Sequence, residues 1–499
     1  MKTSEVEKEL KIGDIFTPLK WGEFAISQFN IFRKWMKGAT IFDPTMGHGH
    51  LLEALILHGQ RKGYAIQELP TQNLYGNELN YSHHKKALSI FRETYKLDMS
   101  QNLWNKDLLD LPEQTFDIIL GNPPWQNYVD LPDIYKQKIK PLFAKFDLID
   151  NKRNLLLGGS RIDIAALIIQ VSIAGFLKEG GDAYFFMPLS LLLNDGAHQP
   201  FRTYKIHETS FAPIRVFDFN KEAVFQKVST RYGLVHFSRN QAPDFPIKYS
   251  VFKQNKWEDY LSAPVGTPTA PLSIYKKHQE KKLNSFNKIK LSKDSMPRQG
   301  LNTCGANNVF FFNICQKINE DFCMVDGTTK LPTKFVFPLL KSVNFKNQTE
   351  KPVAWVLIPH DSKGMPLSED ELNNYPELKS YLENHRQKLT GRKGTLINGW
   401  IKKGRWWALL GVGSYNYASY KVVWEAYGRK CFCPIIVSGI WQANQALQAF
   451  IPAKNKAEAN KILKALKNPA IEEYLLSTRM EGTMNWAQPG KIKKLIEFE

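Results

Sequence analysis

The chain has 499 residues, 43% of them hydrophobic, and a formal net charge of +19. This composition is typical of a globular protein, and the length exceeds what a single hydrophobic core usually serves, so we expect two or more domains. The sequence lacks the roughly 20 uncharged apolar residues of a membrane helix and the apolar core of a signal peptide, so we expect no membrane association and a place in the prokaryotic cytosol, near the nucleoid. Five cysteines without a Cys-x-x-Cys pair predict reduced thiols and no metal centre.

Strands alternate with helices over residues 39–240. Short apolar runs predict strands over 39–42, 74–76, 116–120 and 183–187, and apolar residues predict helices over 51–57 and 164–177. The alternation predicts a Rossmann-like α/β fold with a mainly parallel sheet, covered by helices on both faces. Such sheets bind ligands at the carboxyl ends of their strands.

The composition changes near residue 240, where prolines punctuate a region of weak periodicity. We therefore predict one domain over residues 1–245 and a second, mixed α+β domain over residues 246–499. Residues 454–467 and 471–476 predict helices in the second domain. Residues 1–240 carry a net charge of +3 and residues 241–499 a net charge of +16. This asymmetry favours a polyanion as the partner of the second half, although a solvated basic face would give the same count.

A glycine turn joins the first predicted strand to its helix. Gly47 and Gly49 allow a tight turn and a close approach of the backbone to a ligand. Glu78, after the second strand, can accept both hydroxyl hydrogens of a ribose. The turn lacks the glycine patterns of phosphate-binding loops, and Asp43 before it would repel a pyrophosphate. The turn therefore favours S-adenosylmethionine, which is cationic, over NAD or ATP.

The tetrapeptide Asn122-Pro123-Pro124-Trp125 directly follows the third predicted strand. Two prolines stiffen this loop and keep Asn122 extended. The Asn122 side-chain oxygen and the Pro123 carbonyl can accept both hydrogens of an exocyclic base amine and direct its lone pair at a methyl donor. Trp125 offers a flat face for a flipped base. A proline turn capped by a core tryptophan is the structural alternative.

Together these motifs resemble the gamma-class DNA amino-methyltransferases that modify adenine N6. In that group the cofactor motifs come first, the catalytic tetrapeptide next and the target-recognition domain last. The resemblance implies S-adenosylmethionine as cofactor, double-stranded DNA as substrate and base flipping. It also implies a place in a restriction-modification or phage-defence system, with a possible separate restriction or defence subunit.

The resemblance further assigns residues to roles. Thr17 and Pro18 resemble the motif that lies against the methionine end of the cofactor, and Asp107 resembles the acid that reads its adenine amine. Phe225 resembles a second aromatic residue that packs on the flipped base, with an ordinary core phenylalanine as the alternative. The implied cofactor site consists of Phe16, Thr17, Pro18, Asp43, Pro44, Thr45, Gly47, Gly49, Glu78, Leu79, Asp107, Leu108 and Asn122. The implied catalytic residues are Asn122, Pro123, Pro124, Trp125 and Phe225.

Basic and aromatic side chains are interleaved over residues 392–421. Basic groups position phosphates, and aromatic groups can wedge into or stack on bases. We expect DNA contacts from Arg298, Lys402, Lys403, Arg405 and Trp406. The alternative for Trp406 is a place in a protein core.

Other functions remain open at this point. Methylation of cytosine N4 uses the same geometry, and asparagine at the first position of the tetrapeptide favours adenine over it. RNA bases and protein glutamine are further substrates of related tetrapeptides, although the basic second half is larger than those enzymes need. A non-catalytic DNA-binding subunit with a methyltransferase-like core is a hypothesis from a different functional class.

Overall fold

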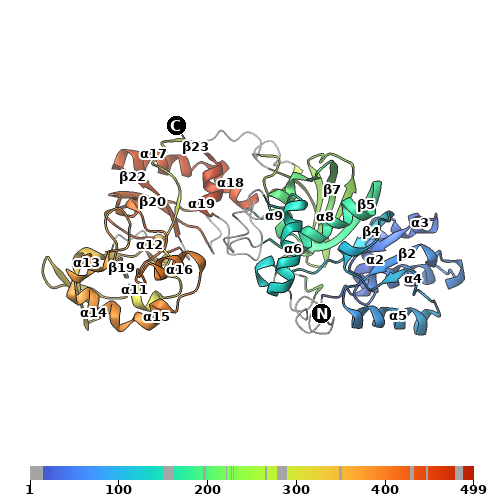
Figure 1. The fold of residues 1–499 in the computed structure, drawn as a ribbon. Coiled ribbons are helices and arrows are strands. Elements are labelled where there is room, and N and C mark those ends of the chain that lie inside the picture. Colours follow the sequence, from blue (N-terminus) through green and yellow to red (C-terminus); the bar gives the residue numbers. More distant parts are fainter. Residues whose placement is uncertain are drawn as a thin grey trace. The chain divides into compact units, whose positions relative to one another are not determined.

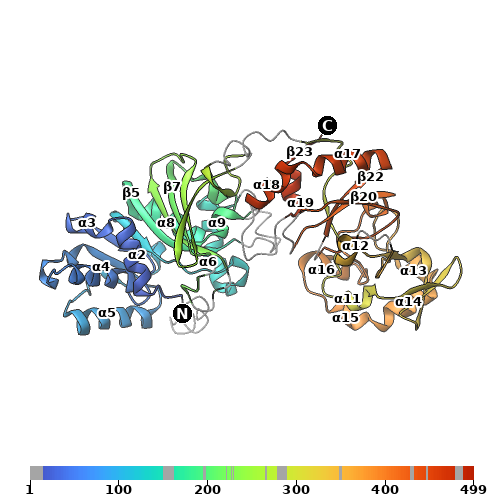
Figure 2. The same cartoon turned by 180° about the vertical axis from the view of Figure 1, so that it is seen from behind.

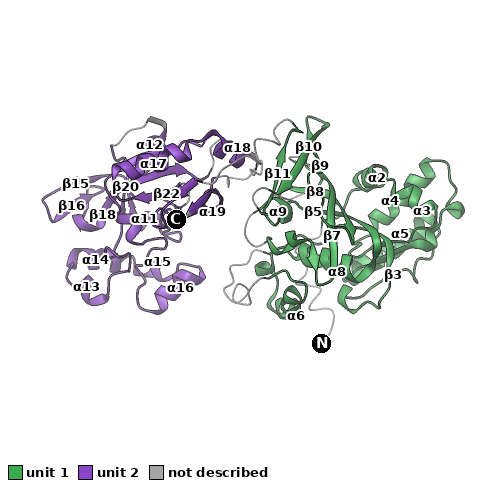
Figure 3. Cartoon of the chain, turned by 90° about the horizontal axis from the view of Figure 1, so that it is seen from above, with its two compact units in different colours: residues 1–280, 480–482 green, residues 281–479, 483–499 purple. Residues whose placement is uncertain are grey.

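The computed structural model describes residues 15–149, 162–194, 198–220, 222–225, 228, 230–264, 267–277, 289–347, 351–427, 432–445, 448–477 and 487–498. The chain forms two compact units, shown in Figure 3. Unit 1 comprises Met1–Glu280 with Met480–Gly482, and unit 2 comprises Lys281–Arg479 with Thr483–Glu499. Among the helices described, none is both long and apolar enough to span a membrane.

An 11-stranded sheet organises unit 1 (Figure 1). Its order is β11-β10-β9-β7-β8-β5-β4-β1-β2-β3, and β6 pairs with β7. Strands β1 to β5 are mutually parallel, whereas β8 runs antiparallel to both β5 and β7. The strands are β1 (Ile41–Asp43), β2 (Leu74–Asn77), β3 (Leu103–Trp104), β4 (Phe116–Gly121), β5 (Leu177–Pro188), β6 (Lys205–Ile206), β7 (Thr209–Asp218), β8 (Tyr232–Arg239), β9 (Ile247–Lys253), β10 (Lys256–Pro264) and β11 (Leu272–Tyr275).

Helices cover both faces of this sheet. One core cluster contains side chains of α2 to α5, and the other contains side chains of α6, α8 and α9. Figure 2 shows α2 to α5 together in the blue part of unit 1. The helices are α2 (Leu19–Gln28), α3 (Ile31–Met36), α4 (His50–Arg61), α5 (Tyr81–Tyr95), α6 (Asp133–Lys145), α8 (Ile164–Phe176) and α9 (Ser190–Leu193).

The sequence of β4 shows why helices cover both faces of the sheet. Phe116 and Ile119 join the cluster with α6 and α8, whereas Ile118 and Leu120 join the cluster with α2 to α5. Successive side chains of a strand point to opposite faces, so a run of apolar residues requires cover on both. Helix α8 is apolar on all sides and almost entirely buried, as such a helix must be.

The structure confirms the predicted α/β class and each predicted strand and helix of unit 1, with ends that differ by a few residues. One difference is larger: Gly180 and Gly181, expected between a helix and a strand, already lie within β5. The expected domain boundary at residue 245 also differs from the observed one, because β9 to β11 continue the unit 1 sheet. Strand β9 pairs with β7, β10 pairs with β9 and β11 pairs with β10. Local composition does not reveal such backbone pairing.

Unit 2 is the predicted mixture of helices and small sheets. Its sheets are β12-β23, β13-β22-β20-β21, β14-β19-β18 and β15-β16-β17. The strands are β12 (Ile289–Leu291), β13 (Arg298–Gln299), β14 (Phe311–Phe312), β15 (Cys315–Lys317), β16 (Phe322–Val325), β17 (Thr329–Pro332), β18 (Val336–Pro338), β19 (Trp355–Leu357), β20 (Tyr420–Glu425), β21 (Ile435–Ser438), β22 (Gln448–Ala453) and β23 (Ile496–Phe498). The helices are α11 (Asn307–Phe310), α12 (Ser342–Asn347), α13 (Glu369–Asn373), α14 (Pro376–Asn384), α15 (Arg386–Thr390), α16 (Thr395–Lys402), α17 (Lys456–Leu466), α18 (Pro469–Ser477) and α19 (Pro489–Lys494). Helices α17 and α18 are the two predicted near the end of the sequence.

Candidate active site

A cavity opens at the carboxyl ends of β1, β2 and β4, where the strand order predicts a ligand site. Eleven of the thirteen residues expected to hold the cofactor line it: Phe16, Thr17, Asp43, Pro44, Thr45, Gly47, Glu78, Leu79, Asp107, Leu108 and Asn122. Pro18 and Gly49 do not line it, because Pro18 caps the start of α2 and Gly49 caps the start of α4.

The glycine turn after β1 has the conformation that its sequence predicts. Gly47 and Gly49 have φ angles of 56° and 81°, in the left-handed region that favours glycine. A Cβ on Gly49 would stand 2.9 Å from Cε2 of Phe91, and a Cβ on Gly47 would stand 3.0 Å from Cε1 of Phe16. Gly47 therefore shapes the cavity wall, whereas Gly49 serves the packing of α4 against α5.

Glu78 links the glycine turn to the end of β2. Its carboxylate accepts hydrogen bonds from the backbone N–H of Gly47 (2.8 Å) and of Asn80 (2.8 Å). These two bonds fix the position of the carboxylate. Asn80 in turn caps α5 through the N–H groups of Ser82 and His83. The predicted ribose acceptor is thus held rigidly in the cavity wall.

Asp43 lies at the bottom of the cavity. Its side chain is 1% exposed, and one carboxylate oxygen accepts the N–H of Thr45 at 3.1 Å. No ion pair among the described residues neutralises it. Burial, together with the nearby charge of Glu78, raises the pKa of Asp43 well above its usual value. A cation in the cavity would relieve this cost, which agrees with the predicted preference for a positively charged ligand.

Asp107 follows β3 and stands at another wall of the cavity. One of its oxygens accepts the N–H of Leu109, and the other pairs with Lys138 Nζ of α6 at 2.5 Å. Lys138 was not anticipated from the sequence, since it lies 31 residues away on another element. The pair holds the Asp107 carboxylate in place beside Tyr135, which also lines the cavity. Burial raises the pKa of the Tyr135 phenol, so this side chain stays neutral.

Asn122 emerges from the end of β4 with one half of its amide engaged. Its Nδ2 donates to the carbonyl oxygen of Ile15 (2.9 Å) and contacts Thr17 Oγ1 (3.1 Å). A carbonyl can only accept, so the contact with Ile15 fixes which side-chain atom is the nitrogen. The other atom, Oδ1, is buried and has no hydrogen-bond partner. Buried polar atoms are almost always paired, so an orphaned acceptor at a cavity wall indicates a place for a donor.

Trp125 is held in a cluster of aromatic side chains. Its indole N–H donates to the carbonyl of Phe186 (3.3 Å). The ring lies 4.9 Å from that of Phe225 and 5.2 Å from that of Tyr232, measured between centroids. Phe225 itself is only 3% exposed. The structure thus brings Phe225 to Trp125, but as an edge-on support and not as a free face for a base.

Several cavity residues were not anticipated from the sequence. Ile164 and Ile168 of α8 and Gln126 after the tetrapeptide complete its wall. Asp163 caps α8 and accepts the N–H groups of Ala165 (2.9 Å) and Gln126 (3.2 Å), so it ties the exit of the tetrapeptide loop to that helix. Burial raises the pKa of Asp163 to about 7. An aspartate before an apolar helix is a cap signal in sequence, but its bond to Gln126 depends on tertiary structure.

The expected DNA-contacting residues of unit 2 have different environments. Lys402 and Lys403 are exposed at the end of α16. The guanidinium of Arg298 lies over the ring of Tyr415 at 4.5 Å, and Arg405 donates to the carbonyl of Pro366 at 2.7 Å. Trp406 is 5% exposed and packs in the core of unit 2. This placement corrects the expectation for Trp406, because an apolar ring covered by core neighbours has no face for a nucleic acid.

Comparison with known proteins agrees with this geometry. Residues 26–225 match the family model described as Eco57I restriction-modification methylase. The chain is 27% identical over 237 residues to the type II methyltransferase M.HincII of Haemophilus influenzae, which is 48% of this chain and 39% of that protein. M.HindII of Haemophilus influenzae strain Rd gives 27% identity over 237 residues and 38% of its length. The chain therefore spans well under half the length of these curated relatives.

A solved structure resembles nearly the whole chain. The type IIL restriction-modification enzyme MmeI, solved in complex with DNA, superposes with a TM-score of 0.59 at 11% identity. The likeness covers 98% of this chain and 65% of that one. At this identity it shows a shared fold and no more. The family match indicates S-adenosylmethionine as the cofactor, and the buried acid, the ribose acceptor and the cavity described above fit that group.

Proposed function

We propose that this protein transfers a methyl group from S-adenosylmethionine to N6 of adenine in double-stranded DNA, after flipping the base out of the helix. The observation that carries the proposal is the buried Oδ1 of Asn122, which has no partner. An exocyclic amine is a poor nucleophile because its lone pair is delocalised into the ring. An acceptor already fixed at the cavity wall can hold one amine hydrogen without reorganisation and leave the lone pair free.

The neighbouring residues support the same role. Nδ2 of Asn122 is held by Ile15 and Thr17, so its Oδ1 cannot turn away when substrate enters. The rigid Pro123-Pro124 turn continues the cavity wall, and the Pro123 carbonyl is the second acceptor. When bound, the cofactor supplies a methyl group activated by a positive sulfur, so no covalent enzyme nucleophile is required. With cofactor and base bound, the nitrogen would gain the methyl group and lose one proton to water, and the sulfur would keep the electrons of the broken bond, while Asn122 and Pro123 would hold the amine.

The cofactor is assigned to specific residues. Glu78 would accept from the ribose hydroxyls, Asp43 would face the cationic end, and Asp107 would accept from the adenine amine. Asp43 is the residue that most favours this ligand, since a buried carboxylate without a counter-ion disfavours a phosphate-bearing cofactor. We also propose a role in restriction-modification or phage defence, with a separate restriction or defence subunit as partner.

Unit 2 is proposed to bind the DNA duplex. Residues 384–424 contain no aspartate or glutamate, and their exposed side chains include Lys388, Lys393, Lys402 and Lys403. Exposed lysines release counter-ions from phosphates when they bind DNA. Methylation of cytosine N4 and a non-catalytic DNA-binding role are the alternatives.

Incubation with labelled S-adenosylmethionine and unmethylated genomic DNA, followed by mass spectrometry of the nucleosides, tests the proposal. We expect N6-methyladenine at one sequence motif, which single-molecule sequencing then identifies. N4-methylcytosine would support the cytosine alternative. Cofactor binding without any transfer to DNA would support the non-catalytic one. An RNA arm and a protein arm in the same assay test the remaining substrates.

A further inference from the structure

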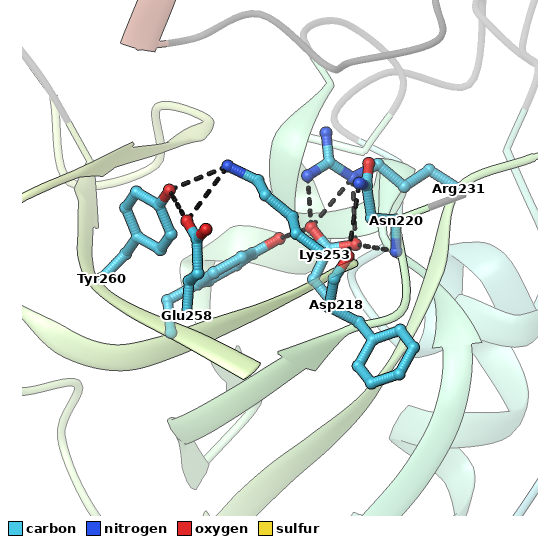
Figure 4. Close-up of polar contacts among 8 residues, drawn as sticks. Asp218, Asn220, Arg231, Lys253, Glu258 and Tyr260 are labelled. Carbon is cyan, nitrogen blue, oxygen red and sulfur yellow. Dashed lines mark hydrogen bonds and ion pairs between the residues drawn. The ribbon is translucent and has the colours of Figure 1, made fainter. Parts of the chain in front are cut away.

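The segment between β7 and β8 carries Phe225 and is tied together at its two ends. Asp218 is the last residue of β7, and Arg231 directly precedes β8. Arg231 pairs with Asp218 through Nε (2.9 Å) and Nη2 (2.5 Å), and the hydroxyl of Tyr249 donates to the same carboxylate at 2.6 Å. Figure 4 shows Asn220 and Arg231 meeting Asp218. The buried ion pair therefore fixes where the segment leaves and re-enters the sheet.

A single hydroxyl holds the middle of the same segment. Tyr232 Oη accepts the N–H groups of Val224 (3.0 Å) and Phe225 (3.3 Å) and donates to the carbonyl of Glu222 (2.7 Å). A phenol has one hydrogen and two lone pairs, so these three bonds use its whole capacity. All three partners are backbone atoms of a short stretch with no regular secondary structure.

The ring of Tyr232 belongs to the aromatic cluster around the tetrapeptide. Its centroid lies 5.2 Å from Trp125 and 5.0 Å from Phe225, and those two rings are 4.9 Å apart. One side chain thus contacts Trp125 with its ring and holds the backbone of Phe225 with its hydroxyl. Any shift of that backbone moves the ring that supports Trp125.

We propose that Tyr232 is a positioning residue that, through Phe225, fixes the Trp125 ring of the base-binding site. The inference rests on the proposed function, since it concerns the Trp125 ring against which a flipped base would stack. Tyr232 does not line the cofactor cavity. Loss of its hydroxyl should therefore impair use of DNA and leave cofactor affinity unchanged.

The test variant is Tyr232→Phe, which keeps the ring and removes the hydroxyl. Its control is Tyr204→Phe, the same change at a buried tyrosine of unit 1 whose hydroxyl has no hydrogen-bond partner. Leaving two backbone donors and one acceptor unpaired at Tyr232 is expected to lower kcat/KM for DNA by about tenfold or more. Tyr204→Phe should match wild type, because nothing loses a partner.

Three measurements on the full chain separate positioning from general destabilisation. Hydrogen exchange should accelerate at the Val224 and Phe225 amides in Tyr232→Phe and stay unchanged in Tyr204→Phe. Cofactor affinity should stay within about twofold of wild type in both variants. With 2-aminopurine at the target position of a duplex, Tyr232→Phe should change the fluorescence of the flipped base, which a merely structural role would leave as in wild type.

The outcomes distinguish the two proposals. Wild-type kcat/KM in Tyr232→Phe, with or without faster exchange, would overturn the positioning role. Unchanged exchange at Val224 and Phe225 would overturn it as well, since the hydroxyl would then not hold the segment. If wild-type protein methylates no DNA, the proposed function fails, and the exchange contrast still decides whether Tyr232 fixes the backbone of Phe225.

Discussion

Replacing Asn122 with alanine separates the two jobs that the structure gives this side chain. Its Oδ1 is free for the substrate amine, whereas its Nδ2 holds Ile15 and Thr17 at the wall of the cofactor cavity. Removing one preorganised hydrogen bond from a transition state costs about 2.7–4 kcal/mol, which corresponds to a loss of roughly 10²- to 10³-fold in kcat. The two lost bonds to the N-terminal segment are worth about 0.5–1.5 kcal/mol each, or about 1–3 kcal/mol together, so cofactor affinity should weaken by about fivefold to a hundredfold.

Single-turnover transfer of labelled methyl groups at saturating cofactor measures the first effect, and titration calorimetry with S-adenosylmethionine measures the second. Thr17→Val is the matched control, because it removes only an acceptor of Nδ2 and leaves Oδ1 in place. It should share part of the loss in cofactor affinity and keep a single-turnover rate within about threefold of wild type. A rate above a tenth of wild type in Asn122→Ala would refute the proposed role of Oδ1.

Three further predictions concern the cavity and its supports. Asp43→Asn should raise the melting temperature of the cofactor-free protein, because burial raises the pKa of Asp43 in the wild type. The same change should weaken S-adenosylmethionine binding by about tenfold to a hundredfold. Equal stabilisation of wild type and variant by the cofactor would contradict this prediction. Asp163→Asn keeps an acceptor for both N–H groups and removes a carboxylate whose pKa rises from 3.8 to about 7 on folding. The wild-type protein loses stability as pH increases across that window, so the variant should melt higher than wild type above pH 7 and alike near pH 4, as read by thermal melts across pH. Gly49→Ala should destabilise unit 1 by about 2–5 kcal/mol, because residue 49 has a left-handed φ and the new Cβ would press on Phe91. Gly175→Ala is the control, since a Cβ at this position on α8 would meet open space. It should stabilise unit 1 by about 0.5–1 kcal/mol, and chemical denaturation measures both effects.

The candidate site could be predicted from sequence at the positions where polar side chains stand at the end of a parallel strand. Asp43 is the last residue of β1, and Glu78, Asp107 and Asn122 come directly or shortly after β2, β3 and β4. The carboxyl ends of parallel strands lie together by geometry. Local order in the sequence was therefore enough to gather these four side chains at one cavity. Their sequence context also indicated the sign of the ligand charge, because an acid without a local cation stands beside the glycine turn.

The partners of these residues depended on the tertiary structure. Lys138 beside Asp107, Asp163 beside Gln126 and the Tyr232 hydroxyl beside Phe225 join segments whose separation in sequence carries no signal. The burial of Trp406 was equally hidden, since an aromatic residue among lysines has the same sequence pattern in a core as on a surface. The boundary after Glu280 followed from the pairing of β9 with β7.

What the sequence determined by itself was the order of strands and helices and the kinds of side chain at the strand ends, because periodicity and turn residues act over a few positions. What only the tertiary structure decided was which buried groups find partners. Whether a polar group finds a hydrogen-bond partner depends on how the whole chain packs. In this structure Nδ2 of Asn122 has a partner, whereas Oδ1 of the same side chain has none.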